Sequence, residues 1–226
     1  MIHPAWERNY QQGRFNKYPF DKVVSFVFRN LGKLTPRDSV KVLDLGCGGG
    51  THAKFLTDEG FAYWGIDGSA EAVRLTKERI KDCPTLTQVQ QGDFCALPYE
   101  NDFFDAVIDR QSMAHNSWQD IQTIVKEIHR VLRPGGLYYG QSFSNQHPDL
   151  EFGRHLGEND YNQFSEGTFF KSEFVHAFDL PQLEQAFAQF QIISLVRVQE
   201  HNALSNRLQS EHYELTAQKP LPDSAV

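Results

Sequence analysis

Two hydrophobic periods alternate along the middle of the chain, and they predict strands interleaved with helices. Short, mostly apolar runs are typical of buried strands, and stripes at a spacing of three and four residues are typical of helices. The predicted strands are Val40–Leu45, Tyr63–Ile66, Thr87–Gln90, Phe104–Ile108 and Leu137–Phe143. The predicted helices between them are His52–Glu59, Ala70–Lys81 and Trp118–Leu132. This alternation predicts an α/β fold with a mostly parallel sheet and helices on both faces.

The flanking segments have different patterns. An apolar stripe predicts a helix over Phe20–Leu31, and Asp179 with Gln182 forms a capping-box variant that opens a helix through about Gln189. Two predicted strands follow, Ile192–Val198 and Tyr213–Gln218. Because no helix separates them, they should pair as an antiparallel hairpin.

Composition limits the classes of partner. The net charge of −7 and the pI of about 5.7 disfavour nucleic acid, since no run of Lys or Arg offsets them. Three cysteines in no metal or disulfide spacing predict reduced thiols in a cytoplasmic protein. The first residues lack the apolar stretch of a signal peptide, and no run approaches the ~20 apolar residues of a membrane span.

A glycine-rich loop follows the first predicted strand of the alternating region. Its spacing is Asp-x-Gly-x-Gly-x-Gly, from Asp44 to Gly50. Glycines at a strand-to-helix turn let the backbone approach a ligand closely, although a tight turn without a ligand is the simpler interpretation of a lone cluster. The dinucleotide fingerprint would need a third glycine at Thr51, so the spacing disfavours a nicotinamide-dependent dehydrogenase.

The loop and four later motifs together resemble class I S-adenosylmethionine-dependent methyltransferases over roughly residues 35–145. The later motifs, in family order, are Asp67, Gly92-Asp93-Phe94, Phe103–Asp109 and Leu132–Gly136. The resemblance implies a Rossmann-like sheet of seven strands with a C-terminal antiparallel hairpin, and S-adenosyl-L-methionine as cofactor. It implies that Asp67 accepts hydrogen bonds from the ribose hydroxyls and that residues after the third strand contact adenine. The cofactor-binding residues expected in this way are Tyr10, Tyr18, Asp44, Gly46, Cys47, Gly48, Gly50, Asp67, Gly68, Ser69, Asp93, Phe94, Arg110 and Gln111.

The resemblance also divides the chain, which we expect to form one methyltransferase domain over residues 1–226. Residues 1–34 would form a lid and a helix, with Trp6, Tyr10, Phe15 and Tyr18 covering the cofactor or packing as ordinary core. Residues 35–144 would be the cofactor-binding core, and 179–226 the last helix and hairpin. Residues 145–178 lack strong periodicity and would build the acceptor pocket. Their candidate contacts are Glu151, Arg154, His155, Tyr161, Phe164, Phe169, Phe170, Lys171 and His176.

Several subclasses of methyl transfer are disfavoured by the motifs. Enzymes that methylate adenine or glutamine amino groups usually carry Asn/Asp-Pro-Pro-Tyr after the fourth strand, where this chain has Asp109-Arg110-Gln111-Ser112. Cytosine-C5 enzymes need Pro-Cys, and this chain has only Cys83-Pro84 in the reverse order. The fifth strand ends in Gln141–Ser144 without an acid, so we expect no metal site.

Histidine 115 is the candidate catalytic residue, because it follows the fourth strand where the transfer centre is expected. A side chain with a pKa near ~6.5 can take the proton of a hydroxyl at neutral pH. The alternative is a histidine that packs beside the cofactor. His176 and His201 are weaker candidates, and the other histidines are expected at the surface.

The sequence therefore predicts a metal-independent methyltransferase acting on a small polar molecule, most simply at a hydroxyl. The expected partner is that small-molecule acceptor, with no nucleic acid and no membrane. Monomer and homodimer both remain open. A non-catalytic S-adenosylmethionine sensor or partner subunit is the alternative function, and a protein or RNA acceptor is a minor one.

Overall fold

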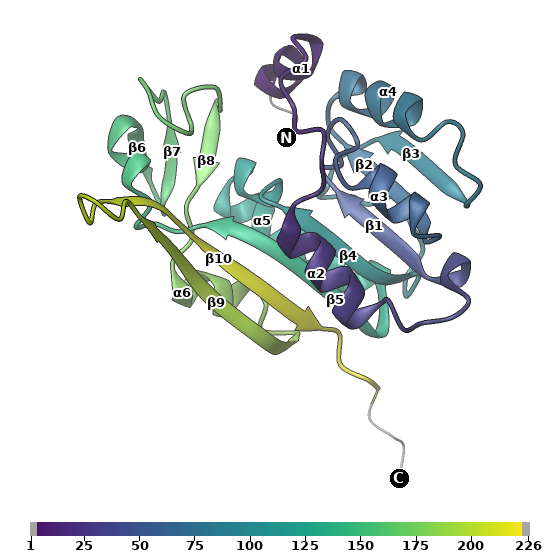
Figure 1. Cartoon of the computed structure of the whole chain (residues 1–226). Helices are drawn as coiled ribbons and strands as arrows, with labels where there is room; N and C mark the ends of the chain where they lie inside the picture. Colours follow the sequence, from purple (N-terminus) through teal and green to yellow (C-terminus); the bar gives the residue numbers. More distant parts are fainter. Residues whose placement is uncertain (1–3, 223–226) are drawn as a thin grey trace.

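One mixed sheet forms the centre of the computed structural model, which describes residues 4–222 (Figure 1). The strand order is β3-β2-β1-β4-β5-β10-β9, with β10 antiparallel to both neighbours. This confirms the predicted seven-stranded sheet with its C-terminal hairpin. The strands are β1 (Lys41–Leu45), β2 (Ala62–Asp67), β3 (Thr87–Gln91), β4 (Phe104–Arg110), β5 (Leu132–Phe143), β9 (Gln191–His201) and β10 (Leu208–Gln218).

The direction of winding reverses at β1, which pairs with β2 on one side and with β4 on the other. Leu45 at the end of β1 is the register partner of both Ile66 and Asp109. The carboxyl ends of β1, β2 and β4 therefore lie side by side. In open α/β sheets this reversal point is where ligands bind, because the loops after the two inner strands diverge there.

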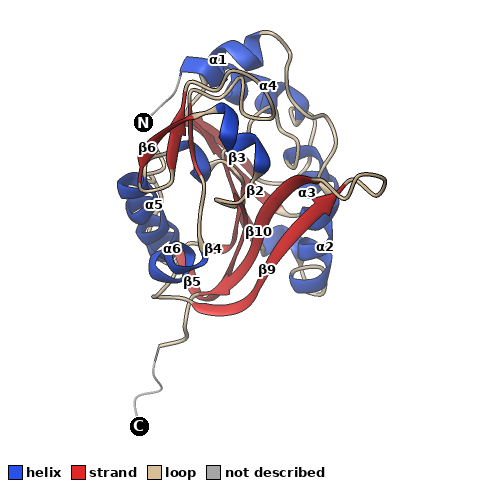
Figure 2. Ribbon diagram, turned by 90° about the vertical axis from the view of Figure 1, so that its left-hand side faces the viewer, coloured by secondary structure: helices blue, strands red, loops and turns tan. Residues whose placement is uncertain are grey.

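Helices cover both faces of the sheet (Figure 2). On one face lie α2 (Asp21–Asn30), α3 (Ala53–Asp58) and α4 (Ala70–Arg79), and on the other lie α5 (Trp118–Val131) and α6 (Leu180–Ala186). The predicted helices are confirmed to within one to three residues at most ends, and α6 has both hydrogen bonds of the predicted capping box. Among residues 4–222, no helix has the length and apolar composition to cross a bilayer.

Two parts of the chain hold structure that the hydrophobic pattern does not predict. Helix α1 (Pro4–Gln11) lies beside α4 (Figure 1), and its few apolar residues give no stripe of useful length. Residues 145–178, expected to be irregular, hold the 3₁₀ turn η3 (Pro148–Phe152) and a second sheet. Its strands, in spatial order, are β6 (Arg154–Gly157), β7 (Asp160–Asn162) and β8 (Phe174–His176). Strands of three or four residues are too short to show a period.

Candidate active site

A cavity of about 630 Å³ opens at the carboxyl ends of the parallel strands. Its volume is in the range of pockets for small molecules. It gathers most of the site residues expected from the sequence. Those that line it are Tyr10, Gly46, Cys47, Gly48, Asp67, Gly68, Ser69, Asp93, Phe94, Arg110, Gln111 and His115.

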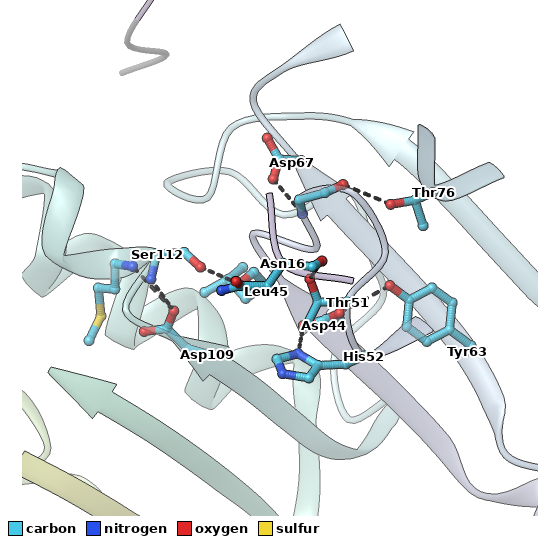
Figure 3. A network of polar contacts seen from close by, with 12 residues as sticks. Asn16, Asp44, Leu45, Thr51, His52, Tyr63, Asp67, Thr76, Asp109 and Ser112 are labelled. Carbon is cyan, nitrogen blue, oxygen red and sulfur yellow. Dashed lines mark hydrogen bonds and ion pairs between the residues drawn. The ribbon is translucent and has the colours of Figure 1, made fainter. Parts of the chain in front are cut away.

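Three of the expected cofactor residues do not line the cavity. Tyr18 is 82% exposed and lies outside it. Asp44 is buried beneath the loop, where it accepts a hydrogen bond from Tyr63 Oη and lies 3.4 Å from His52 Nδ1 (Figure 3). Gly50 has φ +77°, and a Cβ there would lie 3.2 Å from Thr76 Cα. Asp44 and Gly50 therefore support the loop from behind.

The glycine loop has room for backbone but not for side chains. Gly46 has φ +73°, and a Cβ there would lie 2.1 Å from Ser112 Oγ. Gly48 has φ +56°, and its Cβ would lie 2.7 Å from Tyr10 Oη. Any residue with a side chain would be strained at both positions and would meet these neighbours. The backbone of the loop thus forms part of the cavity wall, where a ligand can contact it directly.

The Asp67 carboxylate fixes this loop to the second strand (Figure 3). Its Oδ2 accepts the N–H of Gly48 and its Oδ1 accepts the N–H of Ser69, both at 2.9 Å. Burial raises the pKa of Asp67 to about 6, against the opposing effect of these two hydrogen bonds. Each oxygen of a carboxylate can accept a second hydrogen bond. Asp67 can therefore receive two ligand hydroxyls without giving up the loop.

Two buried nitrogens at the cavity wall have no hydrogen-bond partner among the described residues. They are Nε of Arg110 and Nε2 of His52. The Arg110 guanidinium lies 3.8 Å from the centre of the Phe20 ring, and burial lowers its pKa to about 10. No carboxylate among residues 4–222 forms an ion pair with Arg110. A buried, unpaired guanidinium fits the carboxylate of an amino-acid ligand, such as the methionine portion of S-adenosylmethionine.

His115 lines the same cavity and lies in a mostly aromatic environment. Its ring centre is 4.7 Å from that of Trp6 and 6.2 Å from that of Phe143. Its Nδ1 is 2.9 Å from the carbonyl oxygen of Phe174 in β8. A carbonyl oxygen only accepts, so Nδ1 carries the proton and Nε2 is the basic nitrogen of the neutral ring.

The other histidines differ from the sequence-based expectation. His176 is buried, bonds to Asp160 and stacks on Trp118, and His201 lies on the β9–β10 hairpin, so neither lines the cavity. The expectation that the rest are at the surface is wrong for His52 and His147, which are both buried and line the cavity. A single histidine carries no periodic signal, so the sequence gives no means to place it.

The wall beyond His115 comes mainly from β5, the 145–178 segment and β10. We call it the acceptor end, formed by His115, Phe143, His147, Thr168, Phe169, Ser172 and Ser210. Of the contacts expected from residues 145–178, only Phe169 lines the cavity. The expected residues that do not are Glu151, Arg154, His155, Tyr161, Phe164, Phe170, Lys171 and His176.

Helix α1 spans the cavity and is attached on both sides. On one side Glu7 Oε2 accepts hydrogen bonds from Ser69 Oγ at 2.6 Å and from the N–H of Glu71, which together lower the pKa of Glu7. On the other side Arg8 pairs with Glu173 at 2.5 Å. Trp6 and Tyr10 point from this helix into the cavity wall. The arrangement is that of a strap which joins the α4 side to the β8 side.

The strand order, the glycine loop and the acid that ends β2 define a class I S-adenosylmethionine-dependent methyltransferase fold. Residues 42–136 match the protein-family model described as a methyltransferase domain. Residues 42–136 therefore form a methyltransferase domain, and the fold around it is that of the class I S-adenosylmethionine-dependent methyltransferases, as the motifs predict.

Curated relatives match only part of the chain. An uncharacterised methyltransferase of Synechocystis is 36% identical over 98 residues, which cover 43% of this chain and 44% of the relative. A mitochondrial ubiquinone biosynthesis O-methyltransferase of Rattus norvegicus is 29% identical over 152 residues, covering 62% of this chain and 43% of the relative. The chain thus spans less than half the length of these relatives.

Solved structures share the fold at low sequence identity. The 1,6-didemethyltoxoflavin-N1-methyltransferase of Burkholderia thailandensis, with its acceptor and S-adenosylhomocysteine bound, has a TM-score of 0.68 and 18% identity. The match covers 96% of this chain and 88% of that one. At this identity the likeness shows the fold alone, and it extends over nearly the whole chain.

Lowering the pH through about 6 should weaken binding of S-adenosylhomocysteine. The raised pKa of Asp67 means that its charged form, the better acceptor for ribose hydroxyls, is present above this value and lost below it. Asp67→Asn should weaken binding at neutral pH by about 1.5–3 kcal/mol and flatten the pH dependence, as measured by calorimetry. Burial also raises the pKa of Asp109 to about 6. If binding by Asp67→Asn still weakened as the pH falls through 6, the pH dependence would have to come from another group, such as Asp109. Asp58→Asn on the exposed face of α3 is the control.

Removing the Glu7 carboxylate should loosen α1. In Glu7→Ala, amides of residues 6–11 should exchange about fivefold faster with solvent in the absence of ligand, since a charged hydrogen-bond acceptor is lost. Hydrogen exchange read by mass spectrometry measures this directly. Glu78→Ala, which breaks only an exposed pair with Lys81 on α4, should leave those amides unchanged. Equal exchange in both variants would show that Glu7 does not hold the helix.

Proposed function

We propose that this chain is a methyltransferase which transfers the methyl group of S-adenosylmethionine to a hydroxyl of a small polar molecule. The observation that carries the proposal is the position of His115. Its ring lines the same cavity as the residues expected to bind the cofactor, and it contacts Trp6 and Phe143. A hydroxyl must lose its proton to attack a methyl group, and His115 is the group suited to take it.

Different residues of the cavity would bind different parts of the cofactor. When bound, the cofactor supplies an electrophilic methyl group on a sulfonium. Asp67 would hold the ribose hydroxyls, and Arg110 the carboxylate of the methionine portion. Asp93 and Phe94, which line the cavity after β3, would contact the adenine. With the cofactor fixed, most of the rate enhancement comes from alignment of the acceptor oxygen with the methyl carbon and from exclusion of water.

His115 would take the proton of the acceptor, and the Phe174 carbonyl would hold the ring in place through Nδ1. The hydroxyl of the acceptor would donate to Nε2 of His115, and the oxygen would bond to the methyl carbon as the bond from sulfur to that carbon breaks. The proton then resides on His115. The resulting imidazolium keeps its Nδ1–H bond to the Phe174 carbonyl, which stabilises the positive charge. Strap α1, with Trp6 against His115, would restrict water at this point.

The oxygen acceptor also agrees with one relative, since the rat protein is named as an O-methyltransferase. The solved Burkholderia enzyme is named for methylation of a ring nitrogen, so membership of the family leaves the acceptor atom open. A screen of metabolite pools with methyl-labelled S-adenosylmethionine tests the proposal. Label recovered on nitrogen, carbon or sulfur would contradict the hydroxyl, and no transfer to any pool would favour a cofactor-binding sensor.

Replacing His115 should lower turnover and leave cofactor affinity nearly unchanged. We expect a loss of about 10²–10⁴-fold in His115→Ala, the range for a general base. His115→Asn is the sharper variant, because its amide can still donate to the Phe174 carbonyl in place of Nδ1 while the basic nitrogen is lost. The rate of methyl transfer should fall by similar factors in the two variants, as measured in single-turnover assays. Near-normal turnover in His115→Asn would remove His115 from proton transfer.

Turnover should be independent of divalent metal. The end of β5 supplies no acid, and among residues 4–222 no group of three or more His, Cys, Asp and Glu side chains could hold an ion. Addition of EDTA should therefore leave the initial rate unchanged within error. Loss of turnover that is restored by magnesium would contradict this prediction.

A further inference from the structure

Three of the four charged side chains that line the cavity belong to its cofactor half: Asp67, Asp93 and Arg110, which follow β2, β3 and β4. The fourth is Arg14, which precedes Phe15, whose ring packs on Gly49. Among the described residues, the acceptor end contains no Asp, Glu, Lys or Arg. A carboxylate or phosphate bound there would lose its hydration without gaining an opposite charge, which is costly.

Aromatic rings form the apolar walls of the acceptor end. The ring centre of Phe169 lies 4.8 Å from that of Phe143 and 4.8 Å from that of His147. Phe143 also contacts the ring of His115. The rings pack on one another in edge-to-face and tilted arrangements, which makes this end of the cavity largely aromatic. The polar side chains at this end are the two imidazoles and the hydroxyls of Thr168, Ser172 and Ser210.

The two histidines of the acceptor end have opposite tautomers. In His147, Nδ1 accepts the backbone N–H of Asp149 at 3.2 Å. The proton of the neutral ring must therefore lie on Nε2, which becomes a donor, whereas in His115 the Nε2 is the acceptor. Burial lowers the pKa of His147, which favours this neutral form. In the neutral rings, Nε2 therefore carries a proton in His147 and none in His115.

We propose that the acceptor end binds an uncharged, planar hydroxyl compound, and that His147 determines this specificity. Its Nε2–H donates to a second oxygen of the compound, such as a carbonyl, and so orients the hydroxyl toward Nε2 of His115. This inference rests on the proposed function, since it takes the cavity beyond His115 as the site of the methyl acceptor. On this inference, the acceptor end does not bind carboxylates or phosphates of the same shape.

Matched pairs of small ring compounds test the charge preference. With the protein saturated with S-adenosylhomocysteine, binding of salicylamide is compared with that of salicylate, and 4-hydroxybenzamide with 4-hydroxybenzoate, by ligand-observed NMR at neutral pH. Each amide should bind saturably at millimolar concentration, and at least about tenfold more tightly than its carboxylate partner. Tighter binding of the carboxylates, or no saturable binding of either amide, would overturn the inference.

Two variants test the role of His147. His147→Asn places an amide oxygen where Nδ1 lies, so it can still accept the Asp149 N–H while the Nε2 donor is lost. It should weaken amide binding about tenfold, as expected for one hydrogen bond. His155→Asn makes the same change in the same segment outside the cavity, and it should have no effect. Unchanged amide binding in His147→Asn, with thermal stability retained, would remove His147 from recognition.

Cofactor binding separates this inference from the proposed function. Failure of S-adenosylhomocysteine to bind the wild-type chain would refute the proposed function itself. Normal affinity for S-adenosylhomocysteine, together with a preference for the carboxylates, would refute only the uncharged acceptor.

Discussion

The hydrogen bonds of one buried carboxylate organise the cofactor half of this protein. Asp67 accepts the N–H of Gly48 from the glycine loop and the N–H of Ser69 from the start of α4. Ser69 is in turn the N-cap of α4 and the donor to Glu7 of the strap. The loop after β1, the first turn of α4 and the position of α1 thus depend on a single side chain. Its burial raises its own pKa, so the protein tolerates an unfavourable charge at the place where a ligand with hydroxyl groups can compensate it.

The residues that line the cavity come from two parts of the chain. The matched methyltransferase domain, residues 42–136, contains the glycine loop, Asp67, Arg110 and His115. Trp6, Phe143, His147 and Phe169, which complete the walls, lie outside it. Similarity to relatives is therefore informative about the cofactor half, and the chemistry of the acceptor has to be inferred from this chain alone. Such a division is common in folds that keep one reaction and vary the loops around it.

Sequence patterns were sufficient for the sheet, because its buried strands and amphipathic helices each satisfy a strong periodic constraint. The glycine loop and Asp67 were also expected at the site, because the resemblance to the methyltransferase motifs specifies both, and both line the cavity. The acceptor end was not. The sequence of residues 145–178 offers Glu151, Arg154 and Lys171 as plausible contacts, yet none of them lines the cavity: they lie in η3, in β6 and in the turn before β8. His147 was missed for a related reason: its burial follows from tertiary packing against Phe143 and Phe169, which no local pattern records.

The backbone, through the Phe174 carbonyl and the Asp149 amide, decides which nitrogen holds the proton in the neutral rings of His115 and His147. In the proposed binding mode, recognition of the acceptor would therefore depend on the path of the main chain as well as on the identity of the side chains. A rotation of one peptide unit beside His147 would present a carbonyl in place of the amide and would convert its outer nitrogen from donor to acceptor. Two proteins could then share every residue of this wall and still prefer different ligands, so comparison of cavity residues alone understates how readily specificity can change during evolution.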